Sequence, residues 1–107
     1  MKDSEKIAFR MKLKEGSEDE YKRRHDELWP DLKELLRNAG IRDYSIHLDE
    51  ESGALYGVLW RSKDHGMDEL ANHPVMRKWW DHMADIMEVN DDNSPKVEHL
   101  RMMFHLE

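Results

Sequence analysis

The 107-residue sequence predicts a single α+β domain, residues 1–107, with the element order β-α-β-β-α-β. Three observations support this prediction: segments in which apolar and polar residues alternate, longer segments with apolar residues at every third or fourth position, and breaks marked by glycine or proline. Alternation is typical of a strand with one solvated face, whereas spacing of three and four is typical of an amphipathic helix. A chain of this length is also long enough to bury a core of its own.

The first predicted strand is followed by a helix with start and stop signals. Residues 7–13 alternate, with apolar residues on one face and basic residues on the other. Gly16-Ser17 ends the strand, and Ser17 with Glu20 matches a capping box, in which each side chain binds a free amide at the start of a helix. We therefore expect a helix from Ser17 onwards that is stopped by Gly40 in the left-handed conformation.

This predicted helix carries an apolar stripe and an internal proline. The stripe keeps the spacing of one helical face and consists of Tyr21, His25, Leu28, Leu32, Leu35, Leu36 and Ala39. Pro30 has no amide hydrogen to donate to the carbonyl of Asp26, and its ring crowds that carbonyl. We therefore expect the helix to be kinked close to His25.

The second half of the chain contains the other predicted strands and a second helix. Residues 44–48 and 55–60 lie on either side of a turn-rich segment and predict an antiparallel hairpin. A weaker helical stretch at residues 67–72 precedes a helix that begins at Pro74. The apolar stripe of that helix consists of Met76, Trp79, Trp80, Met83, Ile86 and Met87. After a loop, the alternating Leu100, Met102, Phe104 and Leu106 predict the last strand.

The element order predicts an antiparallel sheet with both helices on one face, a two-layer sandwich of the ferredoxin-like type. Residues 55–60 are apolar on both faces of their strand, since Tyr56 and Val58 alternate with Leu55 and Leu59. Because the helices cover only one face, the other face would be an apolar patch larger than monomers usually expose. Pairing of identical faces around a two-fold axis would cover it, so we expect a homodimer.

Composition and charge exclude several classes of partner. The chain has 17 Lys and Arg against 24 Asp and Glu, and its net charge of −7 disfavours binding to a nucleic-acid backbone. The basic run at residues 22–24 lies among acidic residues, as on a solvated helix face with close charge pairs. No apolar stretch is long enough to span a membrane, and the absence of Cys rules out disulfides and thiolate chemistry. We expect a cytoplasmic protein without a nucleic-acid or membrane partner.

The seven His residues do not have the spacing of a metal site. No His-Glu-x-x-His motif occurs, and no two His residues lie one helical turn apart on a predicted helix. The acidic segment at residues 91–93 lacks the glycine and the terminal Glu of a calcium loop. The five Gly residues are scattered at turns and form no phosphate-binding loop. We therefore expect no metal and no cofactor.

Five aromatic or protic residues are the candidate site. Tyr21 and His25 are one turn apart on the same stripe, although a single His on such a stripe is more often a hydrogen-bonded core residue. Tyr44 begins the apolar face of a strand, where a Tyr with its hydroxyl at the rim is ordinary. Trp79 and Trp80 point about 100° apart, so core packing explains one of them better than both. Together they predict a small aromatic pocket with one imidazole, suited to proton transfer on a neutral polyol.

Five motifs occur in order along almost the whole chain. They are Glu-Tyr-Lys-Arg-Arg-His at 20–25, Trp-Pro-Asp-Leu at 29–32, Tyr-Ser-Ile at 44–46, Trp-Trp-Asp-His-Met-Ala-Asp-Ile-Met at 79–87 and Asp-Asn-Ser-Pro at 92–95. Together they resemble the L-rhamnose mutarotase family. This resemblance implies a dimeric α/β barrel of ferredoxin-like subunits that interconverts the α and β anomers of L-rhamnose without a cofactor. It also implies that His25 is the proton donor and that the sugar is contacted by Tyr21, Tyr44, Trp79 and Trp80.

The chemistry implied by the resemblance is opening and reclosure of the pyranose ring. The ring oxygen gains a proton while the anomeric hydroxyl loses one, and rotation about one bond before reclosure gives the other anomer. His25 is the expected acid, and a general acid contributes about 10²–10⁴-fold to a rate. The group that acts as the base is not determined by the sequence, and the candidates are a tyrosine hydroxyl, a second histidine and water.

Two other functions are compatible with the same fold. One is that of a small cofactor-independent monooxygenase, whose pocket would be more apolar than one lined by two tyrosines and a histidine. The other is that of a non-catalytic ligand-binding or dimerisation module, in which His25 is a hydrogen-bonded core residue. Oxygen consumption distinguishes the first, and exchange between rhamnose anomers distinguishes the second.

Overall fold

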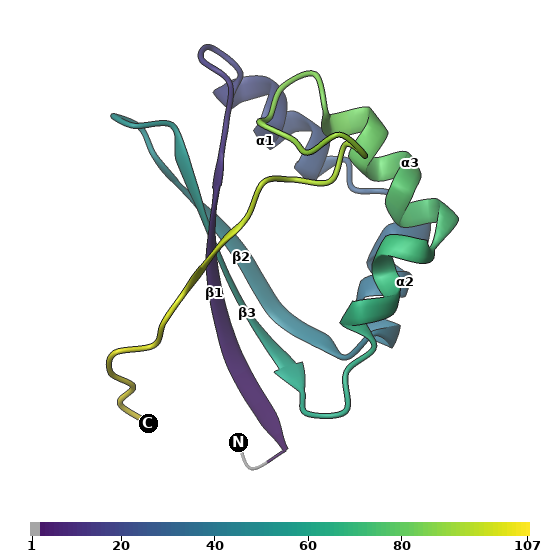
Figure 1. Cartoon of the computed structure of the whole chain (residues 1–107), viewed down its shortest axis with the longest axis vertical. Helices are drawn as coiled ribbons and strands as arrows, with labels where there is room; N and C mark the ends of the chain where they lie inside the picture. Colours follow the sequence, from purple (N-terminus) through teal and green to yellow (C-terminus); the bar gives the residue numbers. More distant parts are fainter. Residues whose placement is uncertain (1–2) are drawn as a thin grey trace.

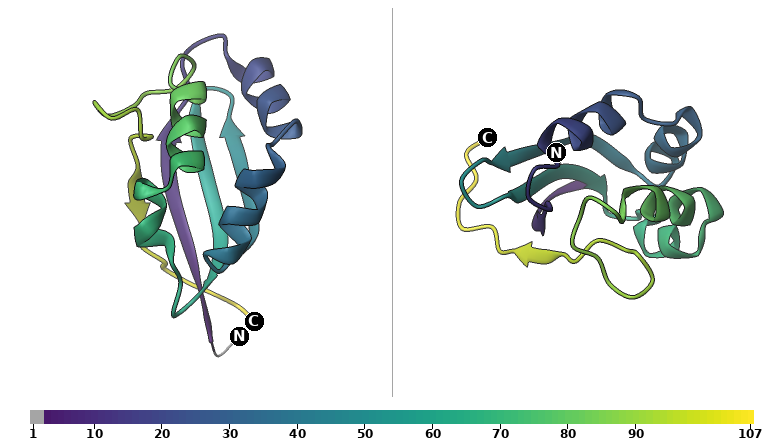
Figure 2. Two further views of the ribbon diagram at one scale, coloured as in Figure 1. Left: turned by 90° about the vertical axis from the view of Figure 1, so that its right-hand side faces the viewer. Right: turned by 90° about the horizontal axis from the view of Figure 1, so that it is seen from above.

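The computed structural model of the chain describes residues 3–107 and consists of a sheet with helices on one of its sides (Figure 1). The strands are β1 (Ser4–Lys12), β2 (Ile41–Asp49), β3 (Ala54–Ser62) and β4 (Glu98–Leu100). The α-helices are α1 (Glu18–Asp26), α2 (Pro30–Asn38) and α3 (Pro74–Met83), and a 3-10 helix, η1 (Met67–Asn72), precedes the last of them. The predicted α+β class and the placement of the helices on one face are confirmed (Figure 2).

The four strands form one antiparallel sheet in the order β2-β3-β1-β4. The predicted hairpin is confirmed, because β2 and β3 pair along their length and are joined by a turn that ends in Gly53 with a φ of 77°. β1 lies in the middle of the sheet and pairs with β3 from Ser4 opposite Ser62 to Lys12 opposite Ala54. A central first strand places its apolar face under the helices over its whole length.

Pro30 separates two helices and does not kink one, so this part of the prediction is wrong. Helix α1 ends at Asp26, and Pro30 is the first residue of α2. Trp29 has extended backbone angles, φ −61° and ψ 131°, because the proline ring disfavours the helical conformation in the residue before it. The first position of a helix tolerates proline because its amide would have no intrahelical partner there. The predicted stop at Gly40 is confirmed, with a φ of 94°.

The predicted capping box is also absent. Ser17 occupies the position before α1, but its side chain makes no capping hydrogen bond. The carboxylate of Glu20 binds the guanidinium groups of Arg23 and Arg24 instead of turning back to the start of the helix. Three hydrogen bonds from two guanidinium groups are stronger than one bond from a neutral amide, which explains the outcome.

The last two predicted elements are shorter than expected. Helix α3 ends at Met83, and the last two residues of its predicted stripe, Ile86 and Met87, are buried beyond its end. Met87 forms an isolated antiparallel bridge with Leu13. Strand β4 covers Glu98–Leu100 only, and residues 101–107 follow it without secondary structure. This apolar tail has no neighbouring strand within the described chain, so its alternation does not produce a strand in one subunit.

The two faces of the sheet have different surroundings. The face towards the helices carries the buried side chains of Phe9, Met11, Leu13, Leu55 and Leu59. The opposite face, which we call the outer face, carries Lys6, Ala8 and Arg10 of β1 opposite Trp60, Val58 and Tyr56 of β3. No described helix packs on the outer face (Figure 2). Among the described residues, no helix has the length and apolar character needed to cross a membrane.

Candidate active site

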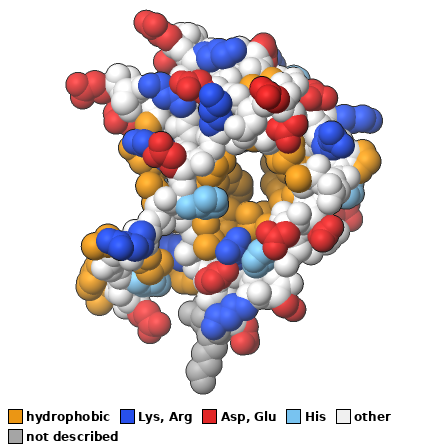
Figure 3. All heavy atoms as spheres, viewed as in Figure 1, with side chains coloured by type: hydrophobic (Ala, Val, Ile, Leu, Met, Phe, Trp, Pro, Cys, Tyr) orange, Lys and Arg blue, Asp and Glu red, His pale blue; other side chains and the backbone are white. Residues whose placement is uncertain are grey.

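A cavity of about 790 Å³ lies between the sheet and the helices. Figure 3 shows hydrophobic side chains gathered around this hollow, which opens to the surface of the molecule. All five residues predicted for the site line it: Tyr21, His25, Tyr44, Trp79 and Trp80. The fold therefore brings together side chains from α1, β2 and α3 that are up to 59 positions apart in the sequence. A cavity of this size is within the range of small-molecule sites.

Helix α1 contributes Tyr21 and His25, which are stacked with their ring centres 4.3 Å apart. The Nδ1–H of His25 donates a hydrogen bond to the carbonyl oxygen of Tyr21, 3.0 Å away. Since a carbonyl only accepts, the proton stays on Nδ1, and Nε2 is the nitrogen free to exchange a proton. Burial lowers the pKa of His25 from its usual value of 6.5, and this is opposed by the bond to Tyr21 and the charge of Asp26.

Helix α3 contributes the two tryptophans, and they differ in burial. Trp79 is 7% exposed and presents its ring face or edge to three neighbours, with centre distances of 5.3 Å to His25, 5.1 Å to Trp29 and 5.6 Å to His82. Trp80 is half-buried and lines the cavity next to it. Trp79 is thus part of the packing that holds His25, whereas Trp80 keeps ring surface available to a ligand.

Tyr44 points into the cavity because of a β-bulge in β2. Arg42 pairs with Trp60 and Ser45 with Val58, so Asp43 and Tyr44 together lie opposite the single residue Leu59. A bulge of this kind shifts the alternation of side chains by one position. Without it, the strand would turn its polar residues to the helices, and with it the helix-facing residues are Ile41, Tyr44, Ile46 and Leu48.

The ring of Tyr44 reaches Phe9 across a glycine. The two ring centres are 6.0 Å apart, although β3 lies between their strands. Gly57 is the β3 residue opposite Phe9, and a Cβ atom there would come within 2.4 Å of the Phe9 ring. The missing side chain therefore makes room for the Phe9 ring to lie over β3 and form the floor of the cavity beside Tyr44.

Both tyrosines stay protonated over the physiological range of pH. Burial raises the pKa of Tyr21, with a further contribution from nearby Tyr44, and burial also raises the pKa of Tyr44. A protonated phenol donates one hydrogen bond and accepts others. The cavity thus offers hydroxyl groups, one imidazole nitrogen and aromatic faces, which are the groups that bind a neutral polyol.

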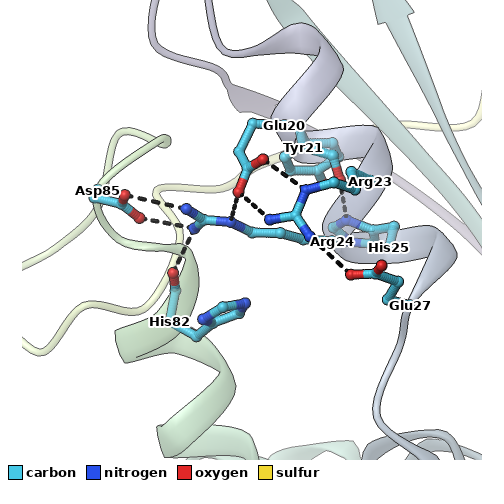
Figure 4. Close-up of polar contacts among 8 residues, drawn as sticks. All are labelled: Glu20, Tyr21, Arg23, Arg24, His25, Glu27, His82 and Asp85. Atoms are coloured by element: carbon cyan, nitrogen blue, oxygen red, sulfur yellow. Dashed lines mark hydrogen bonds and ion pairs between the residues drawn. The ribbon is translucent and has the colours of Figure 1, made fainter.

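An ion-pair network joins α1 to the end of α3, outside the cavity (Figure 4). Arg24 donates to Glu20 on its own helix and to Asp85 and the carbonyl of His82 beyond it. Hydrogen bonds from Arg23, and next from Arg24, lower the pKa of Glu20 to about 2. The predicted solvated helix face is confirmed for Lys22 and Arg23, which pair with acidic residues of the same segment.

The sequence matches the model of one protein family along nearly its whole length. That model is described as L-rhamnose mutarotase, and it covers residues 6–106. The chain belongs to the L-rhamnose mutarotase family. Two similar curated proteins bear the same name: one from Agrobacterium fabrum is 62% identical over 106 residues, covering 99% of each chain, and one from Jannaschia sp. is 60% identical, covering 95% of this chain and 98% of its own.

A solved structure supports the same family. The crystal structure of an L-rhamnose mutarotase from Formosa agariphila superposes with a TM-score of 0.90 at 48% identity, covering 96% of this chain and 99% of the other. The resemblance inferred from the five motifs is therefore confirmed at the level of the family.

Two further residues of this mutarotase-family chain belong to the site region, although they were not among the five predicted site residues: Asn93 lines the cavity, and Trp29 contacts Trp79 without lining it. The contact of Trp29 with Trp79 is edge-on, and the side-chain amide of Asn93 donates to Asp81 over 3.0 Å. The sequence feature that could have indicated Trp29 is its position directly before Pro30, because a residue before proline favours the extended conformation and here separates two helices. Within residues 3–107, no group of three or more acidic or histidine side chains is arranged to hold a metal ion.

The bulge gives a first prediction. Asp43 has a φ of 51°, in the left-handed region, which Asn and Asp adopt far more readily than β-branched residues. We expect Asp43→Val to lower the free energy of unfolding by about 1–2 kcal/mol, as measured by urea denaturation. Asp43→Asn is the matched control and should unfold like the unchanged protein. Equal stability of the two variants would contradict the role of this backbone conformation.

Proposed function

We propose that the chain interconverts the α and β anomers of L-rhamnose. The observation that carries this proposal is the position of His25, whose free Nε2 belongs to the only imidazole among the residues lining the described cavity. Aromatic rings stack on the apolar C–H face of a sugar, and hydroxyl groups bind its oxygens, so the wall around His25 suits a pyranose. The printed names of the relatives support the same substrate. We expect the reaction to take place in the cytoplasm.

The direct test is anomer exchange followed by NMR. Saturation of the anomeric proton of one L-rhamnose anomer should transfer to the other faster with the protein than without it. An unchanged transfer rate at high protein concentration would contradict the proposed activity and favour a non-catalytic binding module. Oxygen consumption with an aromatic substrate tests the monooxygenase alternative, which the two hydroxyls and the imidazole of the cavity disfavour.

In the proposed mechanism, His25 exchanges a proton with the ring oxygen of the sugar. During opening, Nε2–H of the imidazolium protonates the ring oxygen as its bond to the anomeric carbon breaks. A base removes the proton of the anomeric hydroxyl, which becomes the aldehyde oxygen. After rotation about the bond between C1 and C2, reclosure returns both protons and leaves His25 as it began. The bond from Nδ1 to Tyr21 supports this role because it directs Nε2 to the substrate.

The acid role predicts the pH dependence. The folded pKa of His25 lies below 6.5, so its imidazolium becomes scarcer as pH rises through that lowered value. We therefore expect kcat/KM to fall with rising pH, by about tenfold per unit once pH exceeds the pKa. The measurement is the anomer-exchange rate from pH 4.5 to 8.5 at constant ionic strength. A rate that instead falls towards low pH would make His25 the base and refute the acid assignment.

We also propose that each chain is a ferredoxin-like sandwich and that two chains pair as a dimeric α/β barrel. The strand order and the one-sided helices support the sandwich. Pairing is supported by the outer face, with half-buried Tyr56, Val58 and Trp60, and by the tail that follows β4. In that tail, Met103, Phe104 and Leu106 are 78–81% exposed, and a second chain would cover such apolar side chains.

Light scattering tests the dimer. We expect a mass of about twice the 12.9 kDa chain at micromolar concentration. Trp60→Glu, which places a carboxylate on the outer face, should lower that mass to one chain while the far-UV circular dichroism is retained. A monomeric mass for the unchanged protein would refute the pairing.

A further inference from the structure

Arg24 connects the helix that carries His25 to the helix that carries both tryptophans. Its Nε lies 2.7 Å from a carboxylate oxygen of Glu20 on α1. Its Nη1 lies 2.6 Å from the carbonyl oxygen of His82 and 2.8 Å from Asp85, while Nη2 lies 3.2 Å from the other oxygen of Asp85. Only 12% of the Arg24 side chain is exposed, whereas the side chains of its partners Glu20 and Asp85 are 36% and 66% exposed (Figure 4).

The neighbouring arginine has similar partners but makes no connection between helices. Arg23 donates to Glu20 at 2.8 and 2.6 Å and to Glu27 at 2.8 Å, all within one segment of the chain. Its side chain is 56% exposed. Exposed pairs of this kind contribute little to a fold. The two arginines thus share Glu20 and the same helix, and they differ in whether they reach α3.

Helix α1 has few other means of keeping its position. Tyr21 is its one buried residue, and the extended segment around Trp29 separates it from α2. Helix α3, in contrast, buries Met76, Trp79 and Met83. A short helix with one buried side chain is held mainly by the contacts at its ends, and Arg24 makes such contacts one residue before His25.

We propose that Arg24 is a positioning residue that fixes α1 against the end of α3 and thereby holds His25 against Trp79 at the cavity wall. This inference rests on the proposed function for its kinetic consequences. The planar guanidinium reaches two carboxylates and a carbonyl at once, which a lysine ammonium on a flexible stem does not reproduce. A reacting group displaced by about 1 Å can lose about 10²-fold in rate, so a loosened α1 should affect the chemical step.

The experiment compares Arg24→Lys with Arg23→Lys, since both keep the charge of the helix. For Arg24→Lys we expect kcat for anomer exchange to fall about tenfold or more, with KM changed less than threefold because Trp80 and Tyr44 stay in place. For Arg23→Lys we expect both constants to stay within about twofold of those of the unchanged protein. Rates are measured at a temperature well below the unfolding transition of each variant.

A second measurement does not depend on activity. The groups facing His25 are the ring and carbonyl of Tyr21, the ring of Trp79 and the carboxylate of Asp26. If Arg24→Lys releases α1, His25 becomes more hydrated, and its NMR-titrated pKa should rise towards 6.5. Arg23→Lys should leave that pKa unchanged. Asp85→Ala removes the partner on the α3 side and should shift the pKa of His25 in the same direction as Arg24→Lys, so the test survives poor folding of either variant.

Two results would overturn the inference. One is an unchanged kcat and an unchanged His25 pKa in both Arg24→Lys and Asp85→Ala. The other is an equal effect of Arg23→Lys, which would assign the change to charge or helix stability and not to the connection with α3. Failure of the proposed function would look different, because the unchanged protein would then exchange no anomers while the pKa of His25 still reported on its position.

Discussion

Replacing His25 by asparagine should lower the rate of anomer exchange by about 10²-fold or more while the fold stays intact. Asparagine keeps a side-chain amide of similar size, which can still donate to the carbonyl of Tyr21, but it offers no group that titrates near neutral pH. The measurement is NMR exchange between the L-rhamnose anomers, together with the thermal unfolding midpoint of each protein.

His73→Asn is a matched control for this substitution. His73 lies at the start of α3, accepts a bond from the amide of Val75, and does not line the cavity. Asparagine caps helices well, so this variant should keep both stability and activity. Exchange at the unchanged rate in His25→Asn, with an unchanged unfolding midpoint, would show that His25 is not the acid.

Truncation of the two tryptophans should affect different properties, stability for Trp79 and substrate binding for Trp80. Trp79→Ala should lower the free energy of unfolding by about 3–5 kcal/mol, because it leaves a cavity among His25, Trp29 and His82. Trp80→Ala should cost less stability and raise KM for rhamnose about fivefold, which corresponds to the loss of about 1 kcal/mol of stacking.

To test these separate roles, the free energy of unfolding in denaturant and the KM for rhamnose are measured on the same preparation of each variant. The two effects are expected in different variants because Trp79 is 7% exposed whereas Trp80 is half-buried at the cavity wall. Equal losses of stability with KM unchanged in both variants would return the pair to a purely structural role. If KM rose only in Trp79→Ala, Trp79 and not Trp80 would be the residue that contacts the sugar.

Signals between residues close in sequence predicted most of the fold. Alternation predicted β1 and the hairpin of β2 and β3, and Gly40 correctly predicted a left-handed residue after the helix. Helical spacing placed Tyr21 and His25 on one face, and they are stacked in the structure. These signals are reliable because a helical or strand period is a property of the local backbone.

The errors concern local signals with two possible outcomes. Pro30 was compatible with a kink or a new helix, and Glu20 with a capping box or with arginine pairing. The bulge at Asp43 left no clear signal, because Asp is common in strand ends and turns alike. For Pro30 and Glu20, residues a few positions away decided between the two outcomes, namely the restriction of Trp29 by the proline ring and the arginines at positions 23 and 24.

By itself, the sequence determined the α+β class, the family and five of the residues that line the cavity. Only the tertiary structure decided which nitrogen of His25 is free, which tryptophan is buried, and that Arg24 reaches Asp85 across 61 positions of sequence. The physical reason is the separation in sequence over which each interaction acts. Backbone periods and turn preferences act over a few residues and are written in the order of side chains, whereas burial, ring contacts and ion pairs between helices exist only once distant segments are brought together.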